Sequence, residues 1–354
     1  MTKAELDSIK ILPLEDSWYR KVKEKLDGIA KPLDGLGKFE YLIAQIGAIE
    51  KTTKISIQKK AVLVMCADNG VVEEQVSQSG KEVTLAVAKA MGVNNSSVGK
   101  MAAVAGVDVI PVDIGIDTDE VIPGVLPRKV AKGTKNFAKE PAMTEEEVLK
   151  AIETGIQLVQ QCHREGYEIL ATGEMGIGNT TTSTAVAAAL LDLEVEQVTG
   201  KGAGLTDEAL KRKCRVIEEA IEKYFLRDAD AFTILKTVGG LDIAGLTGVF
   251  IGAAIEQIPV IIDGVISAVA ALLAETLCKG AVNYMIPSHK SRELAETAIM
   301  KKLHLDPVLD ADMALGEGTG AVMMMSLLDV ALGVYLQGAS FANFEIEQYK
   351  RYEE

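Results

Sequence analysis

Short runs of apolar residues recur along the chain, separated by longer stretches in which apolar and polar positions follow helical spacing. Each run ends at or beside a Gly, Asp or Asn. Runs of this length, bounded by turn residues, are typical of buried strands in a parallel sheet. The runs predicted as strands are 61–67, 107–115, 167–173 and 258–264.

The stretch 144–166 shows how the intervening helices are delimited. Thr144 is placed as an N-cap with Glu147 at the capping-box position, and Gly166 ends the helix before the next strand. Repeated helix–strand alternation of this kind predicts an α/β fold with a parallel, Rossmann-like sheet. Ligands in such folds bind beyond the carboxyl ends of the strands.

The two ends of the chain differ from its middle, because strands are hard to find there and helical spacing prevails. The stretches with helical spacing are 5–27, 35–51, 291–303 and 320–336. We therefore expect an α/β nucleotide-binding large domain at 58–290. A smaller helical domain is expected from the N- and C-terminal segments, 1–57 and 291–354.

Composition and charge narrow the function. The 354 residues are 48% hydrophobic and 25% charged, as in a soluble globular protein. A formal net charge of −14 argues against a broad nucleic-acid surface. Four scattered cysteines without a CxxC pair indicate reduced thiols, and three histidines without HExxH spacing leave little for a zinc site.

Nothing in the sequence predicts a membrane location. The N-terminal segment mixes charges with apolar residues and lacks a signal-peptide core. The two most apolar stretches, 258–274 and 321–336, are short for a bilayer and are interrupted by Asp263 and Asp329. We expect a cytoplasmic protein.

A glycine-rich segment at 171–191 leaves one predicted strand and enters a helix. Backbone N–H groups at such a turn, together with the helix dipole, favour a phosphate. The segment matches neither a Walker A loop nor GxGxxG, so a merely tight strand–helix turn is the alternative. Glu174 would repel phosphate and is better suited to a sugar hydroxyl or a ring nitrogen.

A second segment, 315–320, places Glu317 between glycines at 316, 318 and 320. Small neighbours let a ligand approach the carboxylate, which suits it to bind a cation or take a proton. The alternative is a helix-start loop with an acid in the first turn.

Two further segments carry candidates with equally plain alternatives. Lys213 follows the Gly200–Gly204 turn, where it could hold an anion or belong to a solvated basic face. Asp242 follows a Gly-Gly turn and Asp263 ends a strand, so each is a site residue or a structural cap.

Taken together, these segments resemble one family. GEMGIGNTT and LGEGTGA occur with six other segments in the family's order: KPLDGLGKFE, ADNGVVEEQVS, GTKNFAKEPAMT, VGGLDIAGLTG, VIIDGV and IPSHKS. The chain resembles the nicotinate-nucleotide–dimethylbenzimidazole phosphoribosyltransferases from about residue 30 to about residue 335. No single segment would carry this weight; the ordered set does.

The resemblance implies transfer of 5-phosphoribosyl from nicotinate mononucleotide to a cobamide lower-ligand base. Nicotinate would leave, and an α-ribotide would form with inversion at C1′. It implies Glu317 as the general base, no metal and no cofactor; we add Glu174 as a carboxylate that offsets oxocarbenium charge. The implied substrate-binding residues are Gly176, Gly178, Asn179, Thr180, Gly202, Ala203, Lys213, Asp242, Asp263, Ser291, Leu315, Gly316, Ser79 and Gly80.

The resemblance leaves the acceptor and the assembly open. The segment 76–95 corresponds to the base pocket, but Ser79-Gly80 and the apolar run at 85–88 depart from the family's polar contacts. The acceptor could be dimethylbenzimidazole, another benzimidazole, a purine or a phenol. A homodimer is implied, and a hetero-oligomer with a paralogue is the alternative.

Two other functions compete with this interpretation. The first is a nucleotide-binding α/β oxidoreductase that uses the glycine turns for a dinucleotide. The absence of GxGxxG and the setting of Glu317 argue against it. The second is a non-catalytic partner subunit, against which the presence of Glu317 speaks.

Overall fold

A computed structural model describes residues 1–202 and 204–351 of the chain. At its centre lies a parallel sheet with the strand order β3-β2-β1-β4-β5-β6. The fold is therefore α/β, as predicted, and the four predicted strands are confirmed as β1, β2, β4 and β5. The strands are β1 Lys60–Ala67, β2 Val107–Gly115, β3 Leu126–Pro127, β4 Ile169–Met175, β5 Val260–Ile262 and β6 Met285–Pro287.

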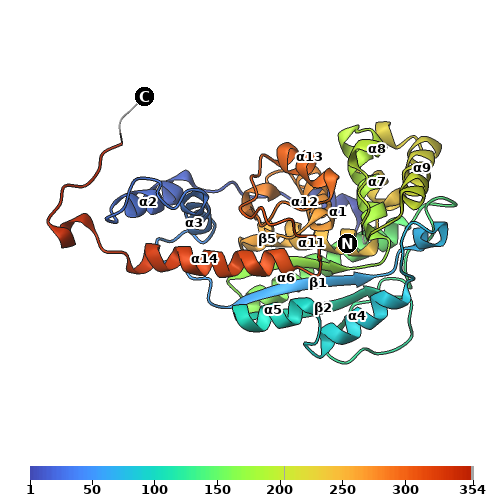
Figure 1. The fold of residues 1–354 in the computed structure, drawn as a ribbon, viewed down its shortest axis with the longest axis horizontal. Helices are drawn as coiled ribbons and strands as arrows, with labels where there is room; N and C mark the ends of the chain where they lie inside the picture. Colours follow the sequence, from blue (N-terminus) through green and yellow to red (C-terminus); the bar gives the residue numbers. More distant parts are fainter. Residues whose placement is uncertain (203, 352–354) are drawn as a thin grey trace.

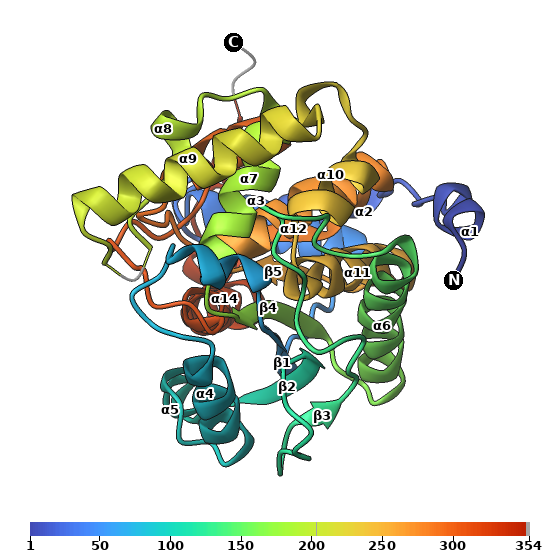
Figure 2. The same cartoon turned by 90° about the vertical axis from the view of Figure 1, so that its right-hand side faces the viewer.

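Helices cover both faces of the sheet. Figure 2 shows α4 and α5 on one side of the central strands and α6 and α11 on the other. The helices are α1 Lys3–Ser8, α2 Asp16–Asp27, α3 Lys38–Ile49, α4 Glu82–Gly92, α5 Ser97–Ala105, α6 Glu145–Arg164, α7 Asn179–Leu191, α8 Val195–Val198, α9 Asp207–Lys223, α10 Ala231–Val238, α11 Leu241–Glu256, α12 Val265–Leu277, α13 Leu294–Leu303 and α14 Thr319–Gln337. Four short 3₁₀ turns are η1 Gly70–Glu74, η2 Leu226–Asp228, η3 Ala281–Tyr284 and η4 Phe341–Phe344.

Strand β1 separates two hydrophobic cores, because successive side chains of a strand point to opposite faces. Leu63 and Met65 pack with α6, α11 and α12 on one face. Val62 and Val64 pack with α3, α5 and α14 on the other. Helix α11 is buried on all sides, which explains why its sequence lacks a polar stripe. Because helices cover both faces of the sheet, a ligand can reach it only at the ends of the strands.

The N-cap predicted for the helix at 144–166 is confirmed. Thr144 Oγ1 accepts from the N–H of Glu147 at 3.2 Å, and the reciprocal bond completes the capping box of α6. The expected helix at 5–27 is wrong as one element: it is divided into α1 and α2. The dividing segment contains Pro13, which has no N–H to donate within a helix.

The terminal helices lie in different places. Helices α2 and α3 pack together at one end of the molecule, close to the C-terminal segment, whereas α7, α8 and α9 lie at the other end (Figure 1). Helix α13 contributes to the core of α12, and α14 lies along the opposite face of the sheet. The division into domains at 57 and 290 stays a prediction.

One helix of the described chain, α14, is long and apolar enough to span a membrane. However, 56% of its most apolar window is buried inside the protein, as in a core helix.

Candidate active site

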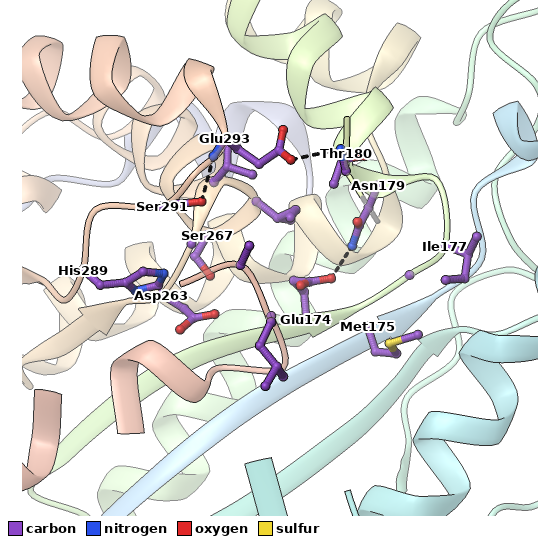
Figure 3. Close-up of a pocket in the computed structure, with 18 residues that line it drawn as sticks. Glu174, Met175, Ile177, Asn179, Thr180, Asp263, Ser267, His289, Ser291 and Glu293 are labelled. Atoms are coloured by element: carbon purple, nitrogen blue, oxygen red, sulfur yellow. Dashed lines mark hydrogen bonds between the residues drawn. The ribbon is translucent and has the colours of Figure 1, made fainter. Parts of the chain in front are cut away.

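A cavity of about 210 Å³ opens beyond the carboxyl ends of β4 and β5 (Figure 3). This is the edge at which α/β folds bind their ligands. Its walls come from the turn before α7, the start of α12, the loop before α13 and the loop before α14. The cavity brings together nine predicted site residues: Glu174, Gly176, Asn179, Thr180, Gly202, Asp263, Ser291, Leu315 and Gly316.

The turn from β4 into α7 forms one wall. Gly178, the N-cap of α7, has φ = 92°, which favours glycine, and a Cβ on Gly176 would lie 2.6 Å from the carbonyl oxygen of Ala67. The N–H of Ile177 donates to Thr84 Oγ1 at 3.2 Å, which fixes the turn against α4. The N-terminus of α7 is thus held open toward the cavity, with its dipole favouring an anion there.

Glu174 lies at the end of β4 and faces Asn179, whose amide donates to it (Figure 3). The pKa of Glu174 is raised to about 8, chiefly by burial; the Asn179 bond lowers it, and the neighbouring charges of Asp242, Asp263 and Glu317 add to the rise. At neutral pH the free protein therefore holds a proton on a carboxyl group inside the cavity.

Asp242 lies behind this wall and does not line the cavity. It is fully buried, accepts from Asn179 Nδ2 at 3.0 Å, and has a pKa raised by burial to about 6. Asp242 therefore orients Asn179, which itself lines the cavity.

Asp263 is a helix cap, and its role as a site residue stays a prediction. Its carboxylate accepts from the N–H groups of Gly318 at 3.2 Å and Ala321 at 3.0 Å, which caps α14, and it also lines the cavity. Burial raises its pKa, and His289 opposes the rise.

Glu317 has φ = 60°, in the left-handed region. It is not one of the residues that line the cavity, although its chain neighbours Leu315 and Gly316 are. Its Oε2 accepts from the N–H of Val98 at 3.0 Å, at the N-terminus of α5. The glycines around it serve close packing: a Cβ on Gly316 would lie 2.8 Å from Glu174 Oε1, and one on Gly318 would lie 3.1 Å from the carbonyl oxygen of Thr172. Glu317 is therefore not a first-turn acid of α14, which was the alternative; its carboxylate instead accepts from the first turn of α5.

Lys213 is fully buried, so the solvated-face alternative is wrong for this residue. Its Nζ donates to Thr180 Oγ1 at 2.9 Å and to the carbonyl of Gly200 at 3.1 Å. Burial lowers its pKa to about 8, against the charge of Glu293. Lys213 therefore supports the α7 turn from behind the cavity wall.

Three further predicted residues, Gly178, Ser79 and Gly80, lie outside the cavity lining. Gly178 packs against Val72 and Asn69. Ser79 and Gly80 are half-buried and do not line the cavity, although their neighbour Gln78 donates to the carbonyl of Gly204. Ala203 lies outside the described residues.

The sequence reading missed three polar residues that line the cavity. Ser267 belongs to α12, and His289 and Glu293 flank Ser291. His289 falls within the IPSHKS segment, which was a usable signal. Nothing in the sequence around Ser267 or Glu293 distinguishes them from ordinary helix-start residues.

Comparisons with known proteins show which family the chain belongs to. A phosphoribosyltransferase family model matches residues 11–346. The nicotinate-nucleotide–dimethylbenzimidazole phosphoribosyltransferase of Acetivibrio thermocellus is 45% identical over 93% of this chain and 94% of its own length. The Clostridium acetobutylicum protein of the same name is 43% identical over 95% and 96%.

The solved structures point the same way. The crystal structure of the Thermus thermophilus protein with that name superposes with a TM-score of 0.88 at 33% identity, covering 95% of this chain and all of the other. The chain belongs to the nicotinate-nucleotide–dimethylbenzimidazole phosphoribosyltransferase family.

Proposed function

We propose that this enzyme moves 5-phosphoribosyl from nicotinate mononucleotide to an aromatic lower-ligand base of cobamides, with inversion at C1′. The products are nicotinate and the α-ribotide. The observation that carries the proposal is the cavity itself, in which a helix N-terminus suited to a phosphate faces carboxyl groups suited to a sugar cation. The identity of the two substrates is inferred from the family to which the chain belongs.

Phosphate and sugar would bind at opposite ends of the cavity. The α7 turn, with Thr180 and Gly202, supplies backbone and hydroxyl groups for the phosphate, and Lys213 adds positive charge behind them. Nicotinate leaves as a neutral ring from a pyridinium glycoside, so the leaving group needs no proton. Charge develops on the ribose instead.

Glu174 is proposed to offset that charge. The pyridinium ring of the bound nucleotide favours the ionised form of a neighbouring carboxyl group and so lowers its pKa from about 8. Glu174 would thus become an anion when the substrate arrives, in a site where carboxylates act strongly on a developing cation.

Glu317 is proposed as the general base that takes the proton of the incoming ring nitrogen or phenol. Leu315 and Gly316, its chain neighbours, line the cavity, and among the described residues its carboxylate accepts from one N–H donor, that of Val98. Rotation of the side chain away from α5 would bring it to an acceptor. A positioned base of this kind contributes roughly 10²- to 10⁴-fold to a rate.

We further propose a cytoplasmic homodimer. Helix α14 carries exposed apolar residues, among them Met323, Val330 (73% exposed) and Leu336, and a second copy would remove them from water. Light scattering on the purified chain tests this: a monomeric mass at micromolar concentration would remove the homodimer, and a dimer only with a co-expressed paralogue would establish the hetero-oligomer.

The decisive experiment is a chromatographic assay with nicotinate mononucleotide and a panel of acceptors. The panel contains dimethylbenzimidazole, benzimidazole, adenine, phenol and p-cresol. We expect release of nicotinate with formation of a new α-ribotide, and the preferred acceptor identifies the base. If no acceptor releases nicotinate while the mononucleotide still binds, the chain is a non-catalytic partner subunit and the proposal is wrong.

A further inference from the structure

Glu293 reaches across the cavity to the Gly200–Gly202 turn. Its Oε1 accepts from the N–H of Gly202 at 3.1 Å (Figure 3). Its other carboxylate oxygen lies against Gly200, where an added Cβ would be 2.0 Å away. The carboxylate is therefore seated closely in the backbone of this turn.

This contact is not explained by the helix that Glu293 precedes. Glu293 is the N-cap residue of α13, yet its side chain makes no capping hydrogen bond to that helix. Its backbone is fixed instead, because its N–H donates to Ser291 Oγ at 3.1 Å. The chain thus holds the residue in place and directs its carboxylate away from its own helix dipole.

The turn that receives the carboxylate is backed by an unpaired cation. Lys213 is fully buried, and its ammonium group donates to two neutral oxygens, those of Thr180 and Gly200. Across the described residues, no carboxylate lies within the 4.0 Å of an ion pair with Lys213. A buried ammonium group with only neutral partners indicates a place for an anion. In the free protein, Glu293 supplies the favourable charge nearby.

We propose that Glu293 is an internal counter-anion, which occupies the Gly202 N–H in front of Lys213 until the phosphate of the nucleotide displaces it. This inference rests on the proposed function, since it assigns the phosphate to this end of the cavity. Two anions cannot share one N–H donor and one cation without strong repulsion. Glu293 therefore weakens phosphate binding and eases release of the α-ribotide, which carries the same phosphate.

The test compares three ligands by calorimetry: inorganic phosphate, nicotinate mononucleotide and nicotinate riboside, which lacks the phosphate. Glu293→Gln should tighten the first two by about tenfold and leave the riboside unchanged, because only phosphate competes with the carboxylate. Glu208→Gln is the matched control. It removes one exposed acid from α9, the helix of Lys213, and should shift each Kd by less than about twofold.

Three outcomes overturn the inference. Unchanged or weaker phosphate binding in Glu293→Gln means that the carboxylate does not compete. An equal loss of mononucleotide and riboside binding makes Glu293 a ribose ligand. Equal tightening by Glu208→Gln reduces the effect to net charge.

Lys213→Met separates this failure from failure of the proposed function. If Lys213→Met loses mononucleotide affinity while Glu293→Gln changes nothing, the phosphate binds near Lys213 as proposed, and only the counter-anion role of Glu293 is wrong. If neither phosphate nor the mononucleotide binds the wild-type protein, the proposed function falls with it.

Discussion

Two groups of carboxylates in this molecule have opposite electrostatic surroundings. The first lies among α2, α3 and the C-terminal segment, and we call it the paired group. The second surrounds the cavity at the carboxyl edge of the sheet, and we call it the cavity group. The paired group is Asp27, Asp34 and Glu40, and the cavity group is Glu174, Asp242 and Asp263.

In the paired group, each carboxylate forms an ion pair with a lysine or arginine. Hydrogen bonds from Arg351 and Lys23 hold the pKa of Asp34 well below its usual range. Burial alone would raise the pKa of Glu40, but bonds from Lys23 (2.9 Å) and Lys31 (2.6 Å) outweigh it and lower the pKa. The carboxylate oxygens lie close enough for a metal ion, yet the lysines already neutralise them.

In the cavity group, burial dominates. It raises the pKa of all three carboxyl groups, to about 8 for Glu174 and about 6 for Asp242. Within the described chain, none of the three forms an ion pair with a lysine or arginine. The paired group therefore stabilises the fold, whereas the cavity group keeps acids without a cationic partner at the place where the proposed reaction would develop positive charge.

The largest expected effect is on rate, at Glu317 beside the cavity group. Glu317→Gln should lower kcat by roughly 10²- to 10⁴-fold, because the amide cannot take a proton. The fold should persist, since a glutamine oxygen can still accept from the N–H of Val98. Nicotinate release measures kcat, and circular dichroism checks the fold. Near-wild-type turnover would remove Glu317 from the base role.

In the paired group, the same Glu-to-Gln change should cost stability instead. Glu40→Gln leaves Lys23 and Lys31 without a full counter-charge at a fully buried position. Removing one partner of a buried ion pair typically costs about 3–5 kcal/mol. Urea unfolding measures the loss, with Asp306→Asn in the exposed pair to Lys38 as the control (77% exposed, below about 1 kcal/mol). A loss no larger than that of the control would contradict the contrast.

Glu174→Gln sharpens the comparison through pH. Between the ordinary pKa of 4.5 and about 8, folded Glu174 keeps a proton that the unfolded chain has released. Wild-type stability should therefore fall as pH rises through this window. Glutamine cannot ionise, so the free energy of unfolding of the variant should not fall in this window. Relative to the wild type it should rise by on the order of 2 kcal/mol or more at pH 8, and not at all at pH 4. If the difference in unfolding free energy between variant and wild type is the same at pH 4 and pH 8, the pKa of Glu174 is not raised.

The sequence was informative where a local pattern decides the structure. Buried apolar runs showed four of the strands. Strand β5 has only three residues but lies within the longer apolar run 258–264, whereas β3 and β6 are short and have no such run around them. The capping box of α6 is local as well, and so was visible. The break between α1 and α2 could have been read from Pro13.

The site was predictable to the same extent. The glycine turn before α7 is a local feature, and it lines the cavity as expected. The burial of Lys213 depends on distant segments, and Glu293 reaches Gly202 across 91 residues of sequence, so no spacing announces either. The same holds for Arg351, whose bonds to Asp27 and Asp34 join segments more than 300 residues apart.

Arg351→Ala should have the smallest effect of the series. Arg351 is 47% exposed, and its bonds of 2.7 Å to Asp27 and Asp34 lie at the surface, where ion pairs contribute about 0.2–1 kcal/mol and are screened by salt. The pKa of Asp34 should rise toward its usual range but stay below it, because Lys23 remains. Urea midpoints at low and high salt measure the effect, with Lys350→Ala as the control from the exposed pair to Glu347. A loss as large as that of Glu40→Gln would mean that the C-terminal segment, rather than the buried lysines, holds the paired group together.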